Sequence, residues 1–347
     1  MSKRRILGGS LVAAGLLACG LSGCGDANGE DASKQAAAED KASLKIKSEP
    51  IQPIRAPEDL RASTVELGRK LFHDKRFSQT GDVSCSTCHV VASGGVDGAQ
   101  HSKGVHDKEG AVNALTVLNS GFNFALFWDG RAATLEEQAG GPLVNPDEMA
   151  FSWDAALDVV KKDTSYAQSF KNDFPDGVTE ANVRKAIATY ERALVTPSRF
   201  DKWLLGDASA ITDDERKGYE LFKSVGCIAC HQGRNVGGNM FQKLGVMGDY
   251  FKDRGNVVTA DYGRFNVTKA EDDKFRFRVP SLRNVAKTAP YFHDGTKKTL
   301  QEAIRTMARY QLGRPLSDED VGLLEKFLRS LSGDLPDGLG DPGASKQ

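Results

Sequence analysis

The chain has 347 residues and an almost balanced charge, with 46 Lys and Arg against 47 Asp and Glu and a formal net charge of -1. This balance argues against a nucleic-acid-binding protein that depends on a global basic field, although it leaves a local basic patch open. Hydrophobic residues make up 39% and charged residues 27% of the chain, which is typical of a soluble globular protein with a hydrophobic core. At this length two domains are expected rather than one.

The first residues carry the pattern of a secretory signal. A Lys-Arg-Arg run at residues 3–5 precedes an apolar run over residues 6–18, which is too short for a membrane-spanning helix of roughly 20 residues. The ending Leu21-Ser22-Gly23-Cys24 resembles a bacterial lipobox, so we expect residues 1–23 to be removed and Cys24 to carry lipid. An ordinary signal peptide that is cut nearby is the alternative.

The residues that follow the signal are predicted to be a flexible tether. Residues 24–56 are rich in Ala, Lys, Glu, Asp and Ser, and they contain too little apolar surface to offset the entropy of ordering. We therefore expect an exported, periplasmic protein that is held on a membrane by its lipid and folds only after residue 56.

Two copies of the pattern C-x-x-C-H carry the strongest chemical signal in the chain. This is the attachment pattern of c-type haem, in which two cysteines form thioethers with the porphyrin and the adjacent histidine reaches the iron. Two disulfides, a thioredoxin-like redox pair or half a zinc site are alternatives, but none requires a histidine directly after the second cysteine. The predicted attachment residues are Cys85, Cys88, His89, Cys227, Cys230 and His231.

A G-x-x-L-F core precedes each C-x-x-C-H motif, starting at Gly68 and at Gly218. A helix, a loop and a haem motif that occur twice suggest two class I cytochrome c units. Apolar residues at helical spacing near residues 183–194 and 321–331 favour a mainly α fold with short strands at most. We predict an N-terminal domain over 57–205, a C-terminal domain over 206–334 and a tail over 335–347.

The residues on the far side of each iron are harder to identify from the residues alone. An electron-transfer haem needs both axial positions filled, whereas a reactive haem needs one that is open or can open. Met307 lies in an amphipathic pattern and is by composition more often a core residue than a ligand. A single histidine such as His106 is likewise more often structural than bound to iron.

Several further stretches resemble the bacterial dihaem cytochrome c peroxidase family, which includes the methylamine-utilisation (MauG) proteins. The resemblance runs from about residue 57 to residue 333 and adds to the two haem motifs in the right order. The matching stretches are Thr116-Val117-Leu118-Asn119, Phe127-Trp128-Asp129-Gly130-Arg131, Gln138-Ala139-Gly140-Gly141-Pro142, Arg278-Val279-Pro280-Ser281-Leu282-Arg283-Asn284 and Ala289-Pro290-Tyr291-Phe292-His293-Asp294-Gly295.

The resemblance implies different roles for the two haems. The C-terminal haem would accept electrons from a small c-type cytochrome or cupredoxin, with Met307 as second iron ligand. A thioether ligand raises the haem potential, which suits this role. The MauG branch uses tyrosine instead, so Met307 favours a peroxidase, and Tyr310 keeps the other branch open.

The N-terminal haem would be the peroxide site. Glu148 matches the family's catalytic glutamate, which moves a proton between the two peroxide oxygens. Gln138 matches a polar neighbour in that pocket, and Trp128 matches a tryptophan placed between the haems. As bare residues, Glu148 would more often face solvent and Trp128 would more often fill the core.

The resemblance also implies a reversible ligand and a metal ion. A histidine on a mobile loop closes the peroxide haem in many members, and His106 is the candidate here, with His101 second. An ungapped count puts that position at Val105, so a one-residue shift is needed. An interdomain calcium ion would take ligands from Asn113, Thr288 and Pro290, the last two through backbone carbonyls.

We therefore predict a dihaem cytochrome c peroxidase that reduces hydrogen peroxide to water, has two covalently bound haem c groups and one Ca²⁺, and forms a homodimer. A MauG-like oxidase of a protein substrate and a non-catalytic dihaem electron-transfer cytochrome are the alternatives.

Overall fold

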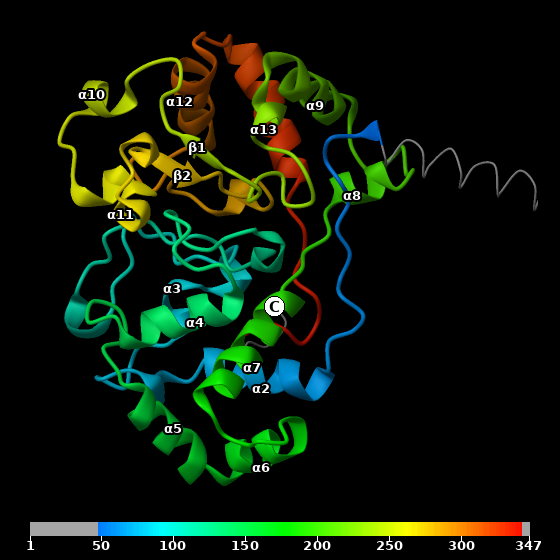
Figure 1. Ribbon diagram of the computed structural model, residues 1–347. Helices are drawn as coiled ribbons and strands as arrows, with labels where there is room; N and C mark the ends of the chain where they lie inside the picture. The colour runs from blue at the N-terminus through cyan, green and yellow to red at the C-terminus, as the bar shows by residue number, and fades with distance from the viewer. Residues whose placement is uncertain (1–47, 342–347) are drawn as a thin grey trace, which may run out of the picture. The chain divides into compact units, whose positions relative to one another are not determined.

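The computed structural model describes residues 48–341, and within them the chain is mostly helical (Figure 1). The only sheet among these residues is the antiparallel pair β1 (Phe241–Lys243) and β2 (Arg276–Arg278). The prediction of a mainly α fold with short strands at most is confirmed. The predicted signal, Cys24 and most of the tether lie outside the described residues.

The α-helices fall into two groups along the chain. The first group ends at residue 204 and consists of α2 (Ala62–Phe72), α3 (Cys85–Cys88), α4 (Leu135–Val144), α5 (Trp153–Lys162), α6 (Thr164–Asp173), α7 (Glu180–Ala193) and α8 (Arg199–Leu204). Those after it are α9 (Asp213–Val225), α10 (Tyr250–Arg254), α11 (Phe265–Thr268), α12 (Leu300–Leu312) and α13 (Asp318–Ser330).

Helices α2 and α7 pack together in a hydrophobic cluster that we call the first cluster. Both helices are amphipathic, so each places its apolar residues on one face. The helices approach closely at Gly68, where a Cβ atom would collide with the carbonyl oxygen of Ala186. Only glycine fits this crossing. Buried members of the first cluster include Leu67, Leu71, Phe72, Ile187 and Tyr190.

Helices α9 and α13 form an equivalent pair in a second cluster. Here Gly218 lies against the carbonyl oxygen of Leu323, so a side chain at residue 218 would again collide with the partner helix. The G-x-x-L-F repeat in the sequence therefore marks two helices that are crossed by their partners in the same way. Buried members of the second cluster include Tyr219, Phe222, Leu324, Phe327 and Leu328.

The first described residues belong to the folded unit, which differs from the expectation of a tether as far as residue 56. Ile51 is fully buried in the second cluster and Ile54 is 2% exposed. Backbone hydrogen bonds join Gly233 to Pro50 and to Gln52. In Figure 1 this blue segment lies beside α9 before the chain runs on to α2. Two isoleucines in an otherwise polar stretch are the reason that the segment is anchored.

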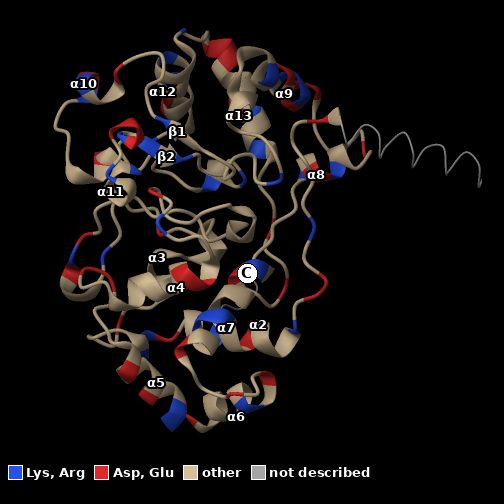
Figure 2. Ribbon diagram, viewed as in Figure 1, with Lys and Arg blue, Asp and Glu red and all other residues tan. Residues whose placement is uncertain are grey.

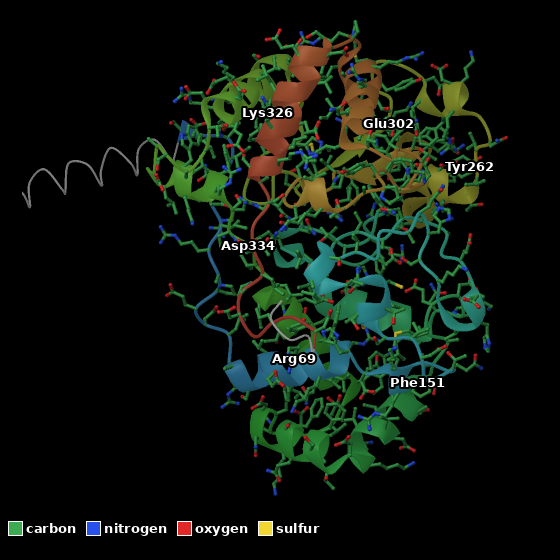
Figure 3. All side chains as sticks on the ribbon, turned by 180° about the vertical axis from the view of Figure 1, so that it is seen from behind. Arg69, Phe151, Tyr262, Glu302, Lys326 and Asp334 are labelled. Atoms are coloured by element: carbon green, nitrogen blue, oxygen red, sulfur yellow. The ribbon has the colours of Figure 1, made fainter. Side chains whose placement is uncertain are left out.

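The C-terminal segment packs on the opposite half of the molecule. After α13 it passes Asp334 and reaches α2, which carries Arg69 (Figure 3). The Tyr190 hydroxyl donates to the carbonyl of Leu339 at 2.7 Å, and Leu339 packs against the first cluster. Residues 335–341, expected as part of a tail, are thus in contact with the first cluster.

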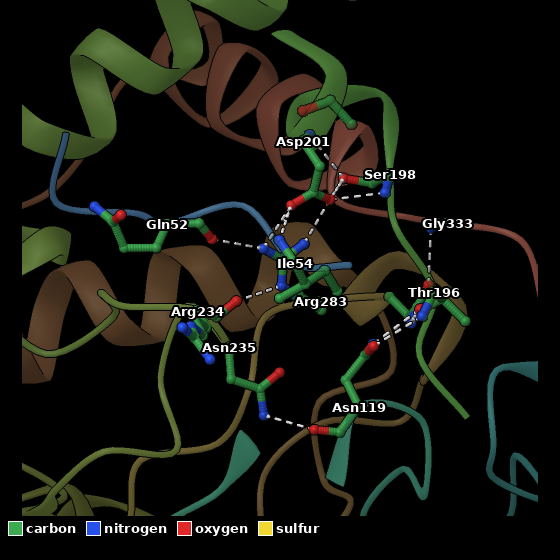
Figure 4. A network of polar contacts seen from close by, with 12 residues as sticks. Gln52, Ile54, Asn119, Thr196, Ser198, Asp201, Arg234, Asn235, Arg283 and Gly333 are labelled. Carbon is green, nitrogen blue, oxygen red and sulfur yellow. Dashed lines mark hydrogen bonds and ion pairs between the residues drawn. The ribbon is translucent and has the colours of Figure 1, made fainter. Parts of the chain in front are cut away.

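A buried ion pair joins the N-terminal segment to the second cluster (Figure 4). The guanidinium of Arg283 is fully buried and binds both carboxylate oxygens of Asp201, at 2.8 and 2.9 Å. It also donates to the carbonyl of Gln52, and Asp201 accepts from the backbone N–H of Ile54 at 2.9 Å. Every charge in this network has a partner, which is what makes its burial tolerable.

Charged residues of both signs are interspersed over the helices in the view of Figure 2. This distribution agrees with the balanced composition and with the absence of a global basic field. None of the helices formed by residues 48–341 is both long and apolar enough to cross a membrane.

Replacing Asp201 by asparagine should lower the free energy of unfolding by about 3–5 kcal/mol, because Arg283 is left as an unpaired buried charge. Guanidinium denaturation measures this loss. The control Asp318→Asn removes the exposed ion pair with Arg305 and should cost no more than about 1 kcal/mol. Equal losses in the two variants would contradict the account of the network.

Candidate functional site

Both C-x-x-C-H motifs lie on single helical turns. In the first, α3, the Thr87 hydroxyl accepts a hydrogen bond from the backbone N–H of Ser84 at 2.9 Å and closes the start of the turn. In the second, α9 ends and Gly226, with φ at 102°, allows the chain to enter a 3-10 turn over Cys227–Ala229. Each turn therefore presents two cysteines and the following histidine from one short piece of chain.

No disulfide joins the four cysteines of the two motifs, so the alternative of two disulfides receives no support. Burial raises the pKa of Cys85 to about 12 and that of Cys227 to about 11. A thioredoxin-like redox cysteine needs a lowered pKa, so the observed direction argues against that alternative too.

The two histidines of the motifs are oriented alike. Nδ1 of His89 lies 3.3 Å from the carbonyl oxygen of Gly95, and Nδ1 of His231 lies 3.3 Å from that of Val236. A carbonyl oxygen only accepts, so Nδ1 carries the proton and Nε2 keeps its lone pair for a metal. Burial lowers the pKa of both rings, that of His231 to about 4, which keeps them neutral.

The first motif faces a cavity of about 190 Å³, the first cavity, whose lining includes Cys85, Cys88 and His89. Gln138 on α4 and Glu148, just after α4, line the same cavity. The carboxyl of Glu148 accepts a hydrogen bond from the side chain of Asn145 at 2.6 Å, and burial raises its pKa. The structure thus brings the predicted catalytic acid and its polar neighbour to the first haem motif.

The second motif faces a larger cavity of about 410 Å³, the second cavity, lined by Cys227, Cys230, His231 and Met307. Met307 reaches it from α12. Tyr310, three residues further on, is not part of the lining, and its hydroxyl donates to Asp253 at 2.9 Å. Of the two residues considered as second iron ligand, the structure brings only Met307 to the cavity.

Trp128 lies in the wall that separates the two cavities and lines both of them. Its indole N–H donates to the carbonyl of Asn113 at 2.9 Å, and its ring makes edge contacts with Phe277 and His293. Backbone, side-chain and ring contacts fix this aromatic group between the two sites. Trp128 therefore lies between the cavities that the two C-x-x-C-H motifs face.

The predicted calcium ligands Asn113, Thr288 and Pro290 all line the second cavity. The amide nitrogen of Asn113 donates to the carbonyls of Ala99 and Gln100, at 3.0 and 3.2 Å, so its side-chain oxygen is left for another partner. The described residues hold no group of three or more His, Cys, Asp and Glu side chains that could bind a metal ion. The calcium site of one amide and two backbone carbonyls therefore stays a prediction.

The two histidines proposed as reversible ligands lie outside the lining of the first cavity. His106 is exposed, has φ at 58° and faces the side-chain oxygen of Gln79 at 3.2 Å. Its neighbour Val105 is buried and donates its backbone N–H to the carbonyl of Glu148 at 2.8 Å. Nε2 of His101 is buried without a hydrogen-bond partner. For either histidine to reach the cavity, the loop would have to move.

The fold and the two cavities define a mainly helical protein with two c-type haem attachment sites. Residues 62–209 match the family described as di-haem cytochrome c peroxidase. Cytochrome c551 peroxidase of Nitrosomonas europaea is 46% identical over 85% of this chain and 88% of that protein. Cytochrome c peroxidase Ccp of Escherichia coli is 48% identical over 83% of this chain, which spans only 62% of that relative.

A solved structure agrees with this relationship. The crystal structure of a MauG-like protein associated with microbial copper homeostasis superposes with a TM-score of 0.71 at 29% identity, over 84% of this chain and 95% of that one. The chain belongs to the di-haem cytochrome c peroxidase family. The family resemblance expected from the sequence is confirmed, and a di-haem family agrees with two attachment motifs.

Two charged residues of the cavities were missed in the sequence. Glu191 on α7 is 5% exposed, lines the first cavity, and has its pKa raised to about 8 by burial. Arg278 at the end of β2 is 2% exposed and lines both cavities. A signal existed for Glu191, since it follows Ile187 by four residues and so lies on the apolar face of its helix. Arg278 is the first residue of one of the stretches that resemble the peroxidase family, and the sequence alone does not show that its side chain is buried.

Glu191→Gln should change how stability depends on pH. The pKa of Glu191 is about 8 in the folded protein against about 4.5 when unfolded, so the folded protein holds the proton more tightly. Wild-type stability should therefore fall as pH rises from about 5 to 8, by up to roughly 1.4 kcal/mol per pH unit, relative to the variant. Guanidinium denaturation at several pH values measures the difference.

Glu180→Gln is the matched control for this experiment, because it removes a solvent-facing carboxyl from the same helix. Its difference from wild type should stay nearly constant over the same pH range. A Glu191→Gln variant with an equally flat difference would contradict the assignment of a buried, neutral carboxyl.

Proposed function

We propose that this protein reduces hydrogen peroxide to water with electrons from a small c-type cytochrome or cupredoxin. The observation that carries the proposal is the inequality of the two adjoining cavities. One combines a haem motif with a half-buried carboxyl, Glu148, and the other combines a haem motif with a thioether, Met307. The two relatives described above, both named peroxidases, support the same activity.

Each cavity would hold one covalently bound haem c in its own cytochrome c-type domain, over residues 57–205 and 206–334, with 335–347 as a tail. Cys85 and Cys88 would attach the first haem, and Cys227 and Cys230 the second. His89 and His231 would bind the irons through Nε2, which their Nδ1 hydrogen bonds leave available. A haem with an openable position supplies the redox chemistry that breaks the peroxide O–O bond.

In peroxide reduction the protein's own residues would move the proton and would hold the proton-carrying carboxyl in position. Partial burial raises the pKa of Glu148, so its carboxyl would take a proton from one peroxide oxygen and return it to the other. Asn145 fixes one carboxyl oxygen at 2.6 Å. Gln138 adds a polar group to the same cavity and positions the substrate.

Electrons would enter at the second haem and reach the first through the wall that contains Trp128. Met307 as second iron ligand would raise the potential of the second haem, which favours acceptance of an electron from the donor protein. Tyr310 takes no part in the cavity lining, and this supports the peroxidase over a MauG-like oxidase. The half-buried Trp128 lines both cavities, which supports this route.

Further proposals concern the setting of the enzyme. A calcium ion held by Asn113, Thr288 and Pro290 would link a segment from the first half of the chain to one from the second half, next to the wall. The N-terminal signal and Cys24 support a periplasmic lipoprotein that is anchored to a membrane. Homodimerisation is proposed from the family alone.

Glu148→Gln should lower peroxide turnover by about 100-fold or more, because the carboxyl that moves the proton is lost. Steady-state oxidation of a ferrocytochrome c by hydrogen peroxide measures it. The control Glu137→Gln changes an exposed residue on α4 that does not line the cavity, and it should keep wild-type turnover. Full activity in Glu148→Gln would contradict the proposed role of Glu148 in proton transfer. No turnover of the wild type at any reduction state would contradict the proposed peroxidase function.

Electron paramagnetic resonance tests the reversible ligand. If His106 binds the first iron at rest, the oxidised protein should be low-spin at both irons and should show a high-spin signal only after half reduction. His106→Ala should then be high-spin when fully oxidised, whereas His101→Ala should resemble the wild type. A high-spin wild-type signal in the fully oxidised state would mean that no histidine closes the site.

A further inference from the structure

Arg278 is a buried cation that has no anionic partner among residues 48–341. Its side chain is 2% exposed, and the only hydrogen bond it makes among the described residues runs from Nε to the carbonyl of Phe127 at 3.1 Å. Nη1 is buried with no hydrogen-bond partner, and no carboxylate of residues 48–341 forms an ion pair with the guanidinium. Burial alone, with no acidic neighbour to oppose it, lowers the pKa of Arg278 to about 10.

Two other arginines with little exposure both have anionic partners. The buried Arg283 has both oxygens of Asp201 and two further carbonyl acceptors (Figure 4). The partly buried Arg254 is paired with Asp261 and Asp294. A buried charge is costly unless it is paired, so these arginines follow the general pattern and Arg278 departs from it. No described residue therefore supplies the anionic partner that a buried guanidinium needs, and a bound group in the adjoining cavities could supply it.

The position of Arg278 identifies that partner's chemistry. The residue lines both cavities, and its backbone N–H donates to the carbonyl of Trp128 at 2.8 Å, so its side chain is held in the wall between the two haem motifs. A haem carries propionate carboxylates, and a guanidinium binds carboxylates through a planar fork of N–H donors. Arg131 also borders the first cavity, but it is already paired with Asp129.

We infer that Arg278 is a cofactor-binding residue that binds propionate carboxylates of both haems, one from each cavity. This inference rests on the proposed function, because it requires a haem in each cavity. One fixed positive charge would then serve two sites. It would orient both haems against the wall that contains Trp128 and would stabilise the reduced, less positive state of both irons.

Spectroelectrochemical titration of Arg278→Gln tests the inference. The equilibrium constant for one-electron reduction should fall roughly tenfold at both haems, which is about 59 mV toward negative potential. The visible spectra that report the axial ligands should not change. The control Arg264→Gln removes a cation that donates to the carbonyls of Asp129 and Gly130 but lines neither cavity, and it should leave both potentials near wild type.

Potentials in Arg278→Gln that match those of the control would overturn the inference, as would a shift at one haem only. If Arg278→Gln does not fold, Arg278→Lys keeps the charge but loses the planar fork. Its resonance Raman spectrum should show altered propionate bending bands at both haems, and unaltered bands would overturn the inference as well. A haem assay first counts the cofactors: fewer than two haems per chain would defeat the proposed function, whereas two haems with unshifted potentials and bands would defeat only the role of Arg278.

Discussion

Four short hydrogen-bonded segments hold the wall between the two cavities, and the rest of the site depends on that wall. The Trp128 indole donates to the carbonyl of Asn113, and the backbone N–H of Asn113 donates to the carbonyl of His293 at 2.7 Å. The backbone N–H of Arg278 donates in turn to Trp128. His293 is itself fixed by Asp261 at 2.7 Å, and burial among paired groups makes this anchor rigid. A displaced wall would change both cavities at once.

The wall also explains why the two sites can be unlike and still work together. Glu148, which follows α4, lines the first cavity, and Met307 on α12 lines the second, so each cavity receives its functional group from a different segment of the chain. The residues that both cavities share are those of the wall. The proposed reactivity of each site therefore comes from residues that line one cavity only, and the proposed electron transfer between the sites runs through the shared wall.

The sequence was most informative where chemistry demands a fixed spacing. The cysteines and histidines at 85–89 and 227–231 must share one turn, so their motif could be read directly, and the paired helix crossings at Gly68 and Gly218 left a visible repeat. Glu148, Gln138 and Trp128 could be singled out only through the family resemblance, because a half-buried carboxyl in a turn has no sequence pattern of its own. Arg278 could not be recognised as special, since its importance lies in the absence of a nearby carboxylate, which only the folded chain reveals.

The two ends of the described chain pack on the opposite halves of the molecule. The segment around Ile51 precedes the first cluster in sequence but is buried in the second, while Leu339 follows the second cluster and packs on the first. If the chain were divided near residue 205 and produced as two polypeptides, each fragment would carry a terminal segment that packs on the other fragment. Each fragment alone would expose the apolar surface that this segment covers, and that surface would be covered again only when the two fragments associate. A cut at this sequence boundary therefore does not separate the fold into two complete parts.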